Sequence, residues 1–514
     1  MNRIKAHYEF TYNRDTGSEL VDVHQNVIEP IANDWQSPDI IPTLQNKLDI
    51  LIKKPGIYPA SEIVKLDPSL YQFFNKLPAY SQINEDGIPP YRPPGEDKNL
   101  LRLAKKHKSK YMMSTSTVSS VLSHIYYSLS NHKSPHFDNL SEAYDREPLK
   151  FMISQRKPST IFLREVDDNL FAVDSDSGFM EEGNIVLLKM GKYMEKMLTT
   201  DWRYFNDHFV LDLKTNKPVK PLDPSLVDED YFRYMRSGKM FLRSQIDTKG
   251  VDSEGNDIVF ELKTRATAVL RYDITNYIDY LDYEVGKYKG QHSSYEREFY
   301  DLVRGGFLKY IMQMKIGQMQ GAAIAYHNTQ KIFGFEYIKL KEMEKRVFGC
   351  PEFSDVIFRS SLTILEKIMD YLLHDQLPKH REKNKIFKVG FYASELSRSL
   401  VVMLEIFEND EMYQERFRNT LPEYMRDPID YYVAHGMKPE VIRYSVKIQP
   451  IHNGIPVDKS PIMFEDGDNL DVRLAINKVG HVDFNQYMKF LHEAYKVQNV
   501  NINNEFVGTW SFNL

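Results

Sequence analysis

The stretch Met240–Asp247 (MFLRSQID), followed by Asp257–Arg265 (DIVFELKTR), decides the fold. Both segments read as strands, and the residues from Val251 to Asp257 that join them are rich in the Gly, Asn and Asp typical of turns. Successive side chains of a strand point to opposite faces. The second strand therefore places Glu261 and Lys263 on one face and the apolar Phe260 and Leu262 on the other.

Asp247 ends the first strand, 14 residues before Glu261 (261 − 247 = 14). Antiparallel pairing across the turn predicts that the two carboxylates lie side by side, where they repel each other. Mg²⁺ relieves such repulsion because it prefers hard oxygen ligands and keeps several waters. Lys263 would orient one of these waters and add positive charge near a scissile phosphate. The pattern therefore predicts metal-dependent hydrolysis of a phosphodiester.

An acid-x-Lys triplet alone is a weak signal, because the chain repeats it at Asp212–Lys214, Glu96–Lys98 and Asp247–Lys249. The triplet at Asp212 follows an apolar strand pattern, but no acid-ending strand precedes it. For Glu261 and Lys263 the alternative interpretation is an ion pair on an exposed strand.

A helix is predicted from Ile185 to Leu198, with Glu195 on the same stripe as Gly191 and Leu198. A carboxylate that points inward needs a partner, and a metal is one option. The alternative is a surface glutamate paired with Lys192 or Lys196.

A long helix is predicted from Tyr295 to about His327, followed by a strand from Lys331 to Leu340. Its small residues from Gly321 to Ala323 would let it pack closely against a sheet. Gln318 and Lys315, near its end, are candidate contacts for a phosphate or for a metal-bound water.

Composition bounds the remaining possibilities for this chain of 514 residues. Hydrophobic residues make up 42% and charged residues 27%, which is typical of a globular protein. The formal net charge of −6 means that the chain as a whole is not basic, so nucleic acid would have to bind in a local basic groove. The candidate residues for such a groove are 105–110, Arg156 and Arg265. Cys350 is the single cysteine, which excludes an internal disulfide and a cysteine-based zinc site. No apolar run approaches the length of a membrane span, and residues 1–16 resemble neither a secretory signal nor a transit peptide.

Three regions follow from the patterns along the chain. Residues 1–110 form an N-terminal extension with a proline-rich loop at 88–95, residues 111–345 hold the alternating helices and strands, and residues 346–514 are helical and then strand-rich. A helix at 114–130, a hairpin about 167–169, a helix at 354–373 and strands at 441–448 and 470–476 are predicted. The predicted fold class is α/β, in the α+β sense of a mixed sheet that is flanked by helices.

The segments Lys110–Thr117, Gly191–Glu195, Phe241–Asp247 and Phe260–Ala266, with Tyr326–Thr329 beyond them, resemble a family of yeast mitochondrial, membrane-associated RNA-processing proteins of the petite series. The resemblance covers residues 110–345 well. That family is assigned to the PD-(D/E)XK nuclease superfamily, so the resemblance implies a nuclease core of that type.

The resemblance also implies catalytic and metal-binding residues. Glu195 is the helix acid, Asp247 and Glu261 are the metal acids, and Lys263 is the motif lysine; with Leu262, the three acids form the predicted ligand set for Mg²⁺, or for Mn²⁺. The predicted substrate contacts are Gln318, Lys315, Arg265 and Arg243. The Gln-x-x-x-Tyr motif of one branch of the superfamily is incomplete here, because Ala322 stands where the tyrosine would follow Gln318.

The activity implied is 5′-to-3′ exoribonuclease action on single-stranded RNA in mitochondrial 5′-end processing and degradation. The resemblance also implies the mitochondrial RNA polymerase as a partner, a location in the mitochondrial matrix and peripheral contact with the inner membrane. Two rival hypotheses stay open: a polymerase accessory factor that uses the nuclease fold for binding, and a DNA nuclease of the same fold, because nothing in the motif recognises a 2′-hydroxyl. The absent transit pattern suggests a mature or trimmed chain.

Overall fold

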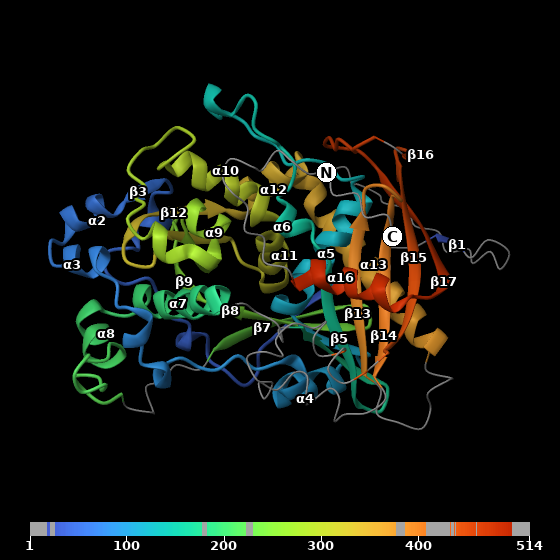
Figure 1. Ribbon diagram of the computed structural model, residues 1–514, viewed down its shortest axis with the longest axis horizontal. Helices are drawn as coiled ribbons and strands as arrows, with labels where there is room; N and C mark the ends of the chain where they lie inside the picture. Colours follow the sequence, from blue (N-terminus) through green and yellow to red (C-terminus); the bar gives the residue numbers. More distant parts are fainter. Residues whose placement is uncertain are drawn as a thin grey trace.

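The computed structural model describes residues 18–20, 26–176, 182–222, 230–376, 386–407, 432, 436, 438–458 and 460–495. The prediction made for residues 1–16 concerns residues outside this part. Within it, strands form two sheets that helices flank (Figure 1). The predicted α+β class with mixed sheets is therefore confirmed. No helix in the described ranges is long and apolar enough to span a membrane.

The larger sheet has the strand order β1-β17-β15-β14-β13-β5-β6-β4-β8-β7-β2, and β16 pairs with β15 beside it. It is mixed, because β4 runs parallel to β6 and β8 while the other pairs are antiparallel. Its strands are β1 (Ser18–Leu20), β2 (Ile28–Ile31), β4 (Tyr111–Ser114), β5 (Ser159–Asp167), β6 (Leu170–Ser175), β7 (Tyr231–Ser237), β8 (Met240–Ile246), β13 (Ile386–Ser394), β14 (Ser399–Phe407), β15 (Glu440–His452), β16 (Ile455–Pro456) and β17 (Leu470–His481).

The smaller sheet has the order β3-β12-β11-β10-β9, in which β10 and β11 are parallel. Its strands are β3 (Ile57–Pro59), β9 (Thr248–Val251), β10 (Asp257–Ala266), β11 (Gly321–His327) and β12 (Ile332–Lys339). The α-helices are α1 (Ile50–Lys53), α2 (Ala60–Leu66), α3 (Leu70–Asn75), α4 (Lys98–Lys106), α5 (Thr115–Leu129), α6 (Ile153–Arg156), α7 (Glu182–Leu198), α8 (Trp202–Phe209), α9 (Ala268–Tyr272), α10 (Tyr295–Gly305), α11 (Phe307–Gly317), α12 (Leu340–Phe348), α13 (Ser354–Gln376) and α16 (Phe484–Tyr495).

Two apolar cores hold these layers. The larger core lies between the larger sheet and helices α5, α11 and α13, and includes Val121, Ile311 and Leu365. The second core joins the Phe260 and Leu262 face of β10 to α7 and to the N-terminal helices. Figure 1 shows α2, α3 and α8 at one end of the molecule and β13–β17 at the other. Burial of apolar side chains on both sides of each sheet is the main force that fixes this arrangement.

Most of the predicted elements are present, including the helices at 114–130, 185–198 and 354–373 and the strands at 441–448 and 470–476. The hairpin about 167–169 is formed by β5 and β6, with Asn169 in the left-handed conformation that its turn requires.

The long helix predicted from Tyr295 to His327 is wrong. Two helices, α10 and α11, are separated at Gly306, and the chain then passes through Gln318 with φ 53° into β11. The last seven residues pair with β10 in parallel and with β12, and all are buried. Ala322 and Ala323 are therefore the small residues of a central strand and not the packing face of a helix.

The predicted pairing of Met240–Asp247 with Ile258–Arg265 is also corrected. β8 belongs to the larger sheet, where it pairs with β4 and β7. The hairpin partner of β10 is the short strand β9, in a register that ends at Phe260 opposite Thr248. Asp247 lies between β8 and β9, at the point where the chain leaves one sheet for the other.

Candidate active site

Asp247, Glu261 and Lys263 come together where the two sheets meet. The carboxylate of Asp247 accepts a hydrogen bond from the backbone N–H of Leu262, with N and Oδ2 3.0 Å apart. Nζ of Lys263 lies 3.7 Å from the same oxygen and forms a close ion pair with Glu261. The adjacency of Asp247 and Glu261 predicted from the sequence is therefore present. Thr248 pairs with Phe260 in the β9–β10 hairpin, and the same register continued by one residue sets Asp247 opposite Glu261.

These groups are enclosed. The side chains of Glu261, Asp247 and Lys263 are 5%, 11% and 25% exposed. The ion pair named as the alternative for Glu261 and Lys263 does exist, but not on an exposed strand. Burying an ion pair costs desolvation free energy and contributes little to stability.

Glu195 of α7 is half-buried and lies close enough to this group to interact with its charges. Its strongest charged neighbour is Lys263, followed by Asp247 and Glu261, and Lys192 ranks below them. Gly191, one turn earlier, brings α7 close to the strand, since a Cβ built there would lie 3.3 Å from Oγ1 of Thr264. We call Glu195, Asp247, Glu261 and Lys263 the acid–lysine cluster.

The cluster shifts the proton affinity of its members. Burial raises the pKa of Glu195 to about 8 and that of Glu261 to about 7, with Lys263 opposing both shifts. The three carboxyl groups hold the pKa of Lys263 well above its ordinary value, against the effect of burial. Lys263 is therefore charged at neutral pH, and one positive charge faces three acidic groups.

The donor chemistry of the cluster fits a hard divalent cation. Three carboxyl groups supply oxygen ligands of the kind that Mg²⁺ and Mn²⁺ take. As the described side chains stand, no three acidic, histidine or cysteine groups are close enough together to hold a metal. The side chain of Leu262 packs in the second core, so the backbone carbonyl is the part of this residue that is free to act as the predicted ligand.

The predicted substrate contacts lie in different surroundings. Arg243 is buried in an ion pair with Asp97 and donates to the carbonyl oxygen of Arg92. Lys315 forms ion pairs with Glu344 and Asp355, at 2.8 and 2.6 Å. Both cations are thus already engaged within the protein.

Gln318 and Arg265 are the other two predicted contacts. Gln318 ends α11, and its carbonyl oxygen accepts a hydrogen bond from Arg233 at 3.0 Å. Arg265 shares the face of β10 that carries Glu261 and Lys263, and its side chain is 10% exposed. Arg265 lies beside the ion pairs that Arg271 of α9 forms with Glu298 and Asp301 of α10. No pattern in the sequence predicted these neighbours.

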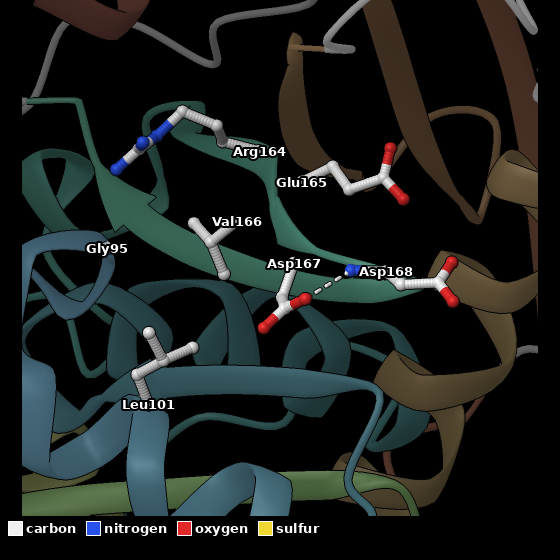
Figure 2. Close-up of a pocket in the computed structure, with 7 residues that line it drawn as sticks. All are labelled: Gly95, Leu101, Arg164, Glu165, Val166, Asp167 and Asp168. Atoms are coloured by element: carbon white, nitrogen blue, oxygen red, sulfur yellow. Dashed lines mark hydrogen bonds between the residues drawn. The ribbon is translucent and has the colours of Figure 1, made fainter.

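A separate hollow of about 500 Å³ lies between β5 and α4 (Figure 2). Figure 2 shows Leu101 on the α4 side and Val166 and Asp167 on the β5 side. Arg164, which lines the hollow, pairs with the buried Asp174 at 3.4 Å. None of the predicted site residues lines it.

Comparison with known proteins places the chain among mitochondrial proteins. A model of the family described as mitochondrial protein Pet127 matches residues 91–370. The mitochondrial mRNA degradation protein pet127 of Schizosaccharomyces pombe is 31% identical over 360 residues, which cover 67% of this chain and 66% of that protein. The putative mitochondrial translation system component PET127 of Saccharomyces cerevisiae is 30% identical over 346 residues, or 62% of this chain and 40% of that protein. The matches thus span less than two thirds of either relative.

Among solved structures, Scheffersomyces stipitis Rai1 matches with a TM-score of 0.30 and 12% identity, over 66% of this chain and 79% of that chain. Dxo1 of K. lactis, in complex with manganese, matches with a TM-score of 0.32 and 8% identity, over 76% of this chain and 91% of that chain. Scores of this size describe a loose similarity of overall shape.

Proposed function

The chain belongs to the Pet127 family of mitochondrial proteins, and from that premise we propose that it is a metal-dependent exoribonuclease that degrades RNA from the 5′ end. The observation that carries the proposal is the acid–lysine cluster. Three elements, α7, the β8–β9 link and β10, bring three carboxyl groups around one lysine in a nearly closed site. The relative from S. pombe is described as an mRNA degradation protein, which supports RNA as the substrate.

Each member of the cluster has a defined task in this proposal. Glu195, Asp247 and Glu261, with the carbonyl of Leu262, would hold Mg²⁺ or Mn²⁺. Such an ion supplies an activated water and stabilises the charge that develops on a phosphate. The N–H of Leu262 fixes the Asp247 carboxylate in place. Lys263, oriented by its pairs with Glu261 and Asp247, directs its positive charge toward the scissile phosphate.

The test follows degradation of 5′-phosphorylated, 3′-labelled single-stranded RNA with Mg²⁺ or Mn²⁺. Asp247→Asn and Lys263→Ala should lower the rate by about a hundredfold or more, since each removes a group that acts on the reacting phosphate. Asp212→Asn and Lys214→Ala are the matched controls. Asp212 is an exposed residue whose carboxylate accepts from the N–H groups of Lys214 and Thr215 in a turn, so both controls should keep full activity.

The substrate and the polarity are tested in the same assay. We expect release of 5′ nucleotides from RNA and slower action on DNA of the same sequence. Equal action on DNA would favour the DNA-nuclease hypothesis. A wild type that is inert with both metals would overturn the catalytic assignment and leave the accessory-factor hypothesis.

The resemblance supports two further parts of the proposal, the mitochondrial RNA polymerase as partner and peripheral contact with the inner membrane. If the chain binds the polymerase through surfaces outside the acid–lysine cluster, Asp247→Asn should abolish RNA degradation and leave polymerase capture intact. Loss of both would place the partner at the catalytic face.

A further inference from the structure

The proline-rich loop at residues 88–95 is attached to the strand that leads to Asp247. The carbonyl oxygen of Arg92 accepts a hydrogen bond from Arg243 of β8 at 2.7 Å. Asp97, just beyond the loop, forms a buried ion pair with the same guanidinium. Four of the eight loop residues are prolines, and each proline fixes its own backbone dihedral φ. The loop is therefore a rigid segment with a defined place on β8.

Tyr91 is the aromatic residue of this loop, and 43% of it is exposed. Its hydroxyl oxygen lies 3.0 Å from Oγ of Ser116 and 3.4 Å from Oγ of Ser114, at the start of α5. These contacts fix the far end of the side chain, while the ring remains open to solvent. Because the ring is already held in one orientation, a flat ligand can stack on it at little cost in conformational entropy.

The larger sheet determines where Tyr91 lies relative to the acid–lysine cluster. Ser114, which ends β4, pairs with Arg243 in the parallel register of β4 and β8. Asp247 comes four residues after Arg243, a span of roughly 13 Å in a strand. Since β4 and β8 are parallel, their last residues lie toward the same edge of the sheet. Tyr91 therefore lies near the edge at which Asp247 leaves the sheet, at a distance of this order from it.

A polar row fills the interval between Tyr91 and the cluster. The exposed amide of Gln245 donates to the carboxylate of Asp230 at 3.0 Å. The antiparallel register of β7 and β8, continued by one residue, sets Asp230 opposite Asp247. Burial raises the pKa of Asp230, and Arg92 is one of the cations that oppose this rise. The exposed side chain of Arg92 thus lies within electrostatic reach of the row that leads to the cluster.

We propose that Tyr91 is a stacking platform for a base of single-stranded RNA, whose backbone passes Arg92 on its way to the acid–lysine cluster. This inference rests on the proposed function, because it assigns the cluster as the place of cleavage. Every base has a π face, so such a platform binds RNA without regard to sequence. In a stacked strand with a rise of 3.4 Å per nucleotide, 13 Å corresponds to about four nucleotides, and to fewer in an extended strand.

The chemistry of this surface favours an unpaired nucleic-acid strand. An aromatic face beside an exposed guanidinium matches a base beside its phosphate. Bases inside a duplex already stack on one another, so the ring is of use only to a single strand. Tyr71 of α3 is more exposed, at 56%, but lies at one end of the molecule among the N-terminal helices (Figure 1). Tyr91 differs from it in its fixed hydroxyl and in its place near the cluster.

The experiment measures binding and not cleavage. Anisotropy titrations in EDTA compare 3′-labelled oligouridine with an oligomer of the same length that has abasic spacers in place of the nucleosides. Tyr91→Ala should weaken binding of oligouridine about tenfold, within the range for one stacked base, and leave binding of the abasic oligomer unchanged. Tyr91→Trp, which keeps an aromatic face, should bind both oligomers as wild type does. Tyr71→Ala is the matched control and should change neither affinity.

Arg92→Gln tests the path of the backbone. It should weaken the binding of both oligomers alike, because both carry phosphates. The slope of log affinity against log salt concentration should become shallower by about 0.7, the value for one phosphate contact with a single strand. Tyr91→Ala should keep the wild-type slope, since stacking releases no counterions. An Arg92→Gln that binds both oligomers like wild type would overturn the path past this residue.

Two results would overturn the platform. One is a Tyr91→Ala that binds oligouridine as tightly as wild type does, and the other is an equal loss for the two oligomers. Failure of the proposed function is distinguishable from both. A base-dependent loss in Tyr91→Ala, with a wild type that degrades no RNA in Mg²⁺ or Mn²⁺, would retain the platform and reject the nuclease. Degradation by wild type without a base-dependent loss would retain the nuclease and reject the platform.

Discussion

Lys263 lies between the carboxylates of Glu261 and Asp247, and Glu195 adds a third acidic group from α7. At the scale of single residues, this concentration of charge in a closed site is the most informative feature of the molecule. Stability alone does not require it, because apolar residues would fill the same volume at a lower desolvation cost. Such groups are more easily explained by chemistry at the site.

The raised carboxyl pKa values predict a pH dependence of metal-free stability. The pKa of Glu195 is raised to about 8 and that of Glu261 to about 7, so both bind protons more tightly in the folded state. Their stabilising effect is present at low pH and is lost as pH rises through about 7 to 8. In EDTA, the Tm of wild type should therefore fall, relative to that of Glu195→Gln, between pH 6 and pH 9.

Metal should reverse this trend, because binding requires ionised carboxylates. With Mn²⁺, the gain in Tm should be larger at pH 8 than at pH 6 in wild type and much smaller in Glu195→Gln. A metal-induced gain that is independent of pH, or equal in both proteins, would contradict the assignment of Glu195 as a ligand.

Arg271 carries a second residue-scale prediction. It pairs with Glu298 and Asp301, whose side chains are fully buried. Arg271→Met would leave two buried carboxylates without one of their ion-pair partners, and breaking such pairs costs about 3–5 kcal/mol. Chemical denaturation should show a loss of that size, and Arg203→Gln should stay within about 0.5 kcal/mol of wild type. A near-neutral Arg271→Met would mean that Arg297 takes over its role.

At the scale of elements, the decisive event is the change from α11 to β11. Gly306 interrupts the helix, Gln318 ends α11 in the left-handed conformation, and Gly321 begins a buried strand. The change places Ala322 opposite Glu261 in the parallel pair of β10 and β11. The strand that supports the acid–lysine cluster is thus built from residues whose sequence looked like the end of a helix.

Gly321 tests this arrangement. A Cβ there would lie 2.6 Å from the carbonyl oxygen of Ile338 and 2.7 Å from the hydroxyl of Tyr337. Gly321→Ala should therefore destabilise the protein by about 1–3 kcal/mol through overpacking. Gly286→Ala, at a position with nothing within 4 Å of the new Cβ, is the matched control and should be neutral. Equal unfolding midpoints for the two variants would argue against the close approach of β11 and β12.

At the scale of the whole molecule, one sheet unites distant parts of the chain. Strands from all three regions predicted from the sequence, 1–110, 111–345 and 346–514, take part in the larger sheet, and β13 pairs directly with β5. The same sheet also contains β8, and Asp247 directly follows the last residue of that strand. The boundaries of the three regions remain a prediction, but the C-terminal strands are physically continuous with the layer that positions the site.

This continuity predicts the effect of truncation. A fragment that ends at Lys345 loses α13 and β13–β17, which would expose the edge of β5 and one side of the apolar core around α5. Exposed strand edges and apolar surface favour aggregation. The fragment should be insoluble, whereas a chain that ends at Tyr495 should be soluble and melt cooperatively. A soluble, cooperatively melting 1–345 fragment would instead establish the C-terminal region as a separate domain.

The sequence by itself determined which residue types share one face of β10 and most of the elements. The alternation of β10 assigned Glu261 and Lys263 to one face, because side-chain direction along a strand depends on local geometry alone. Helix periodicity indicated α5, α7 and α13, and apolar alternation indicated β15 and β17, for the same local reason. The resemblance to a mitochondrial family was also recognisable from short sequence segments such as Phe241–Asp247 and Phe260–Ala266.

Only the tertiary structure decided how these parts meet. Short runs such as Gly321–His327 suit a helix or a strand equally well, and burial between β10 and β12 selects the strand. The path of the chain through Asp247, from the larger sheet into the smaller one, depends on contacts between residues far apart in the sequence, such as the pairing of β8 with β4. No local pattern encodes such contacts, since they arise when separate apolar faces are buried against one another.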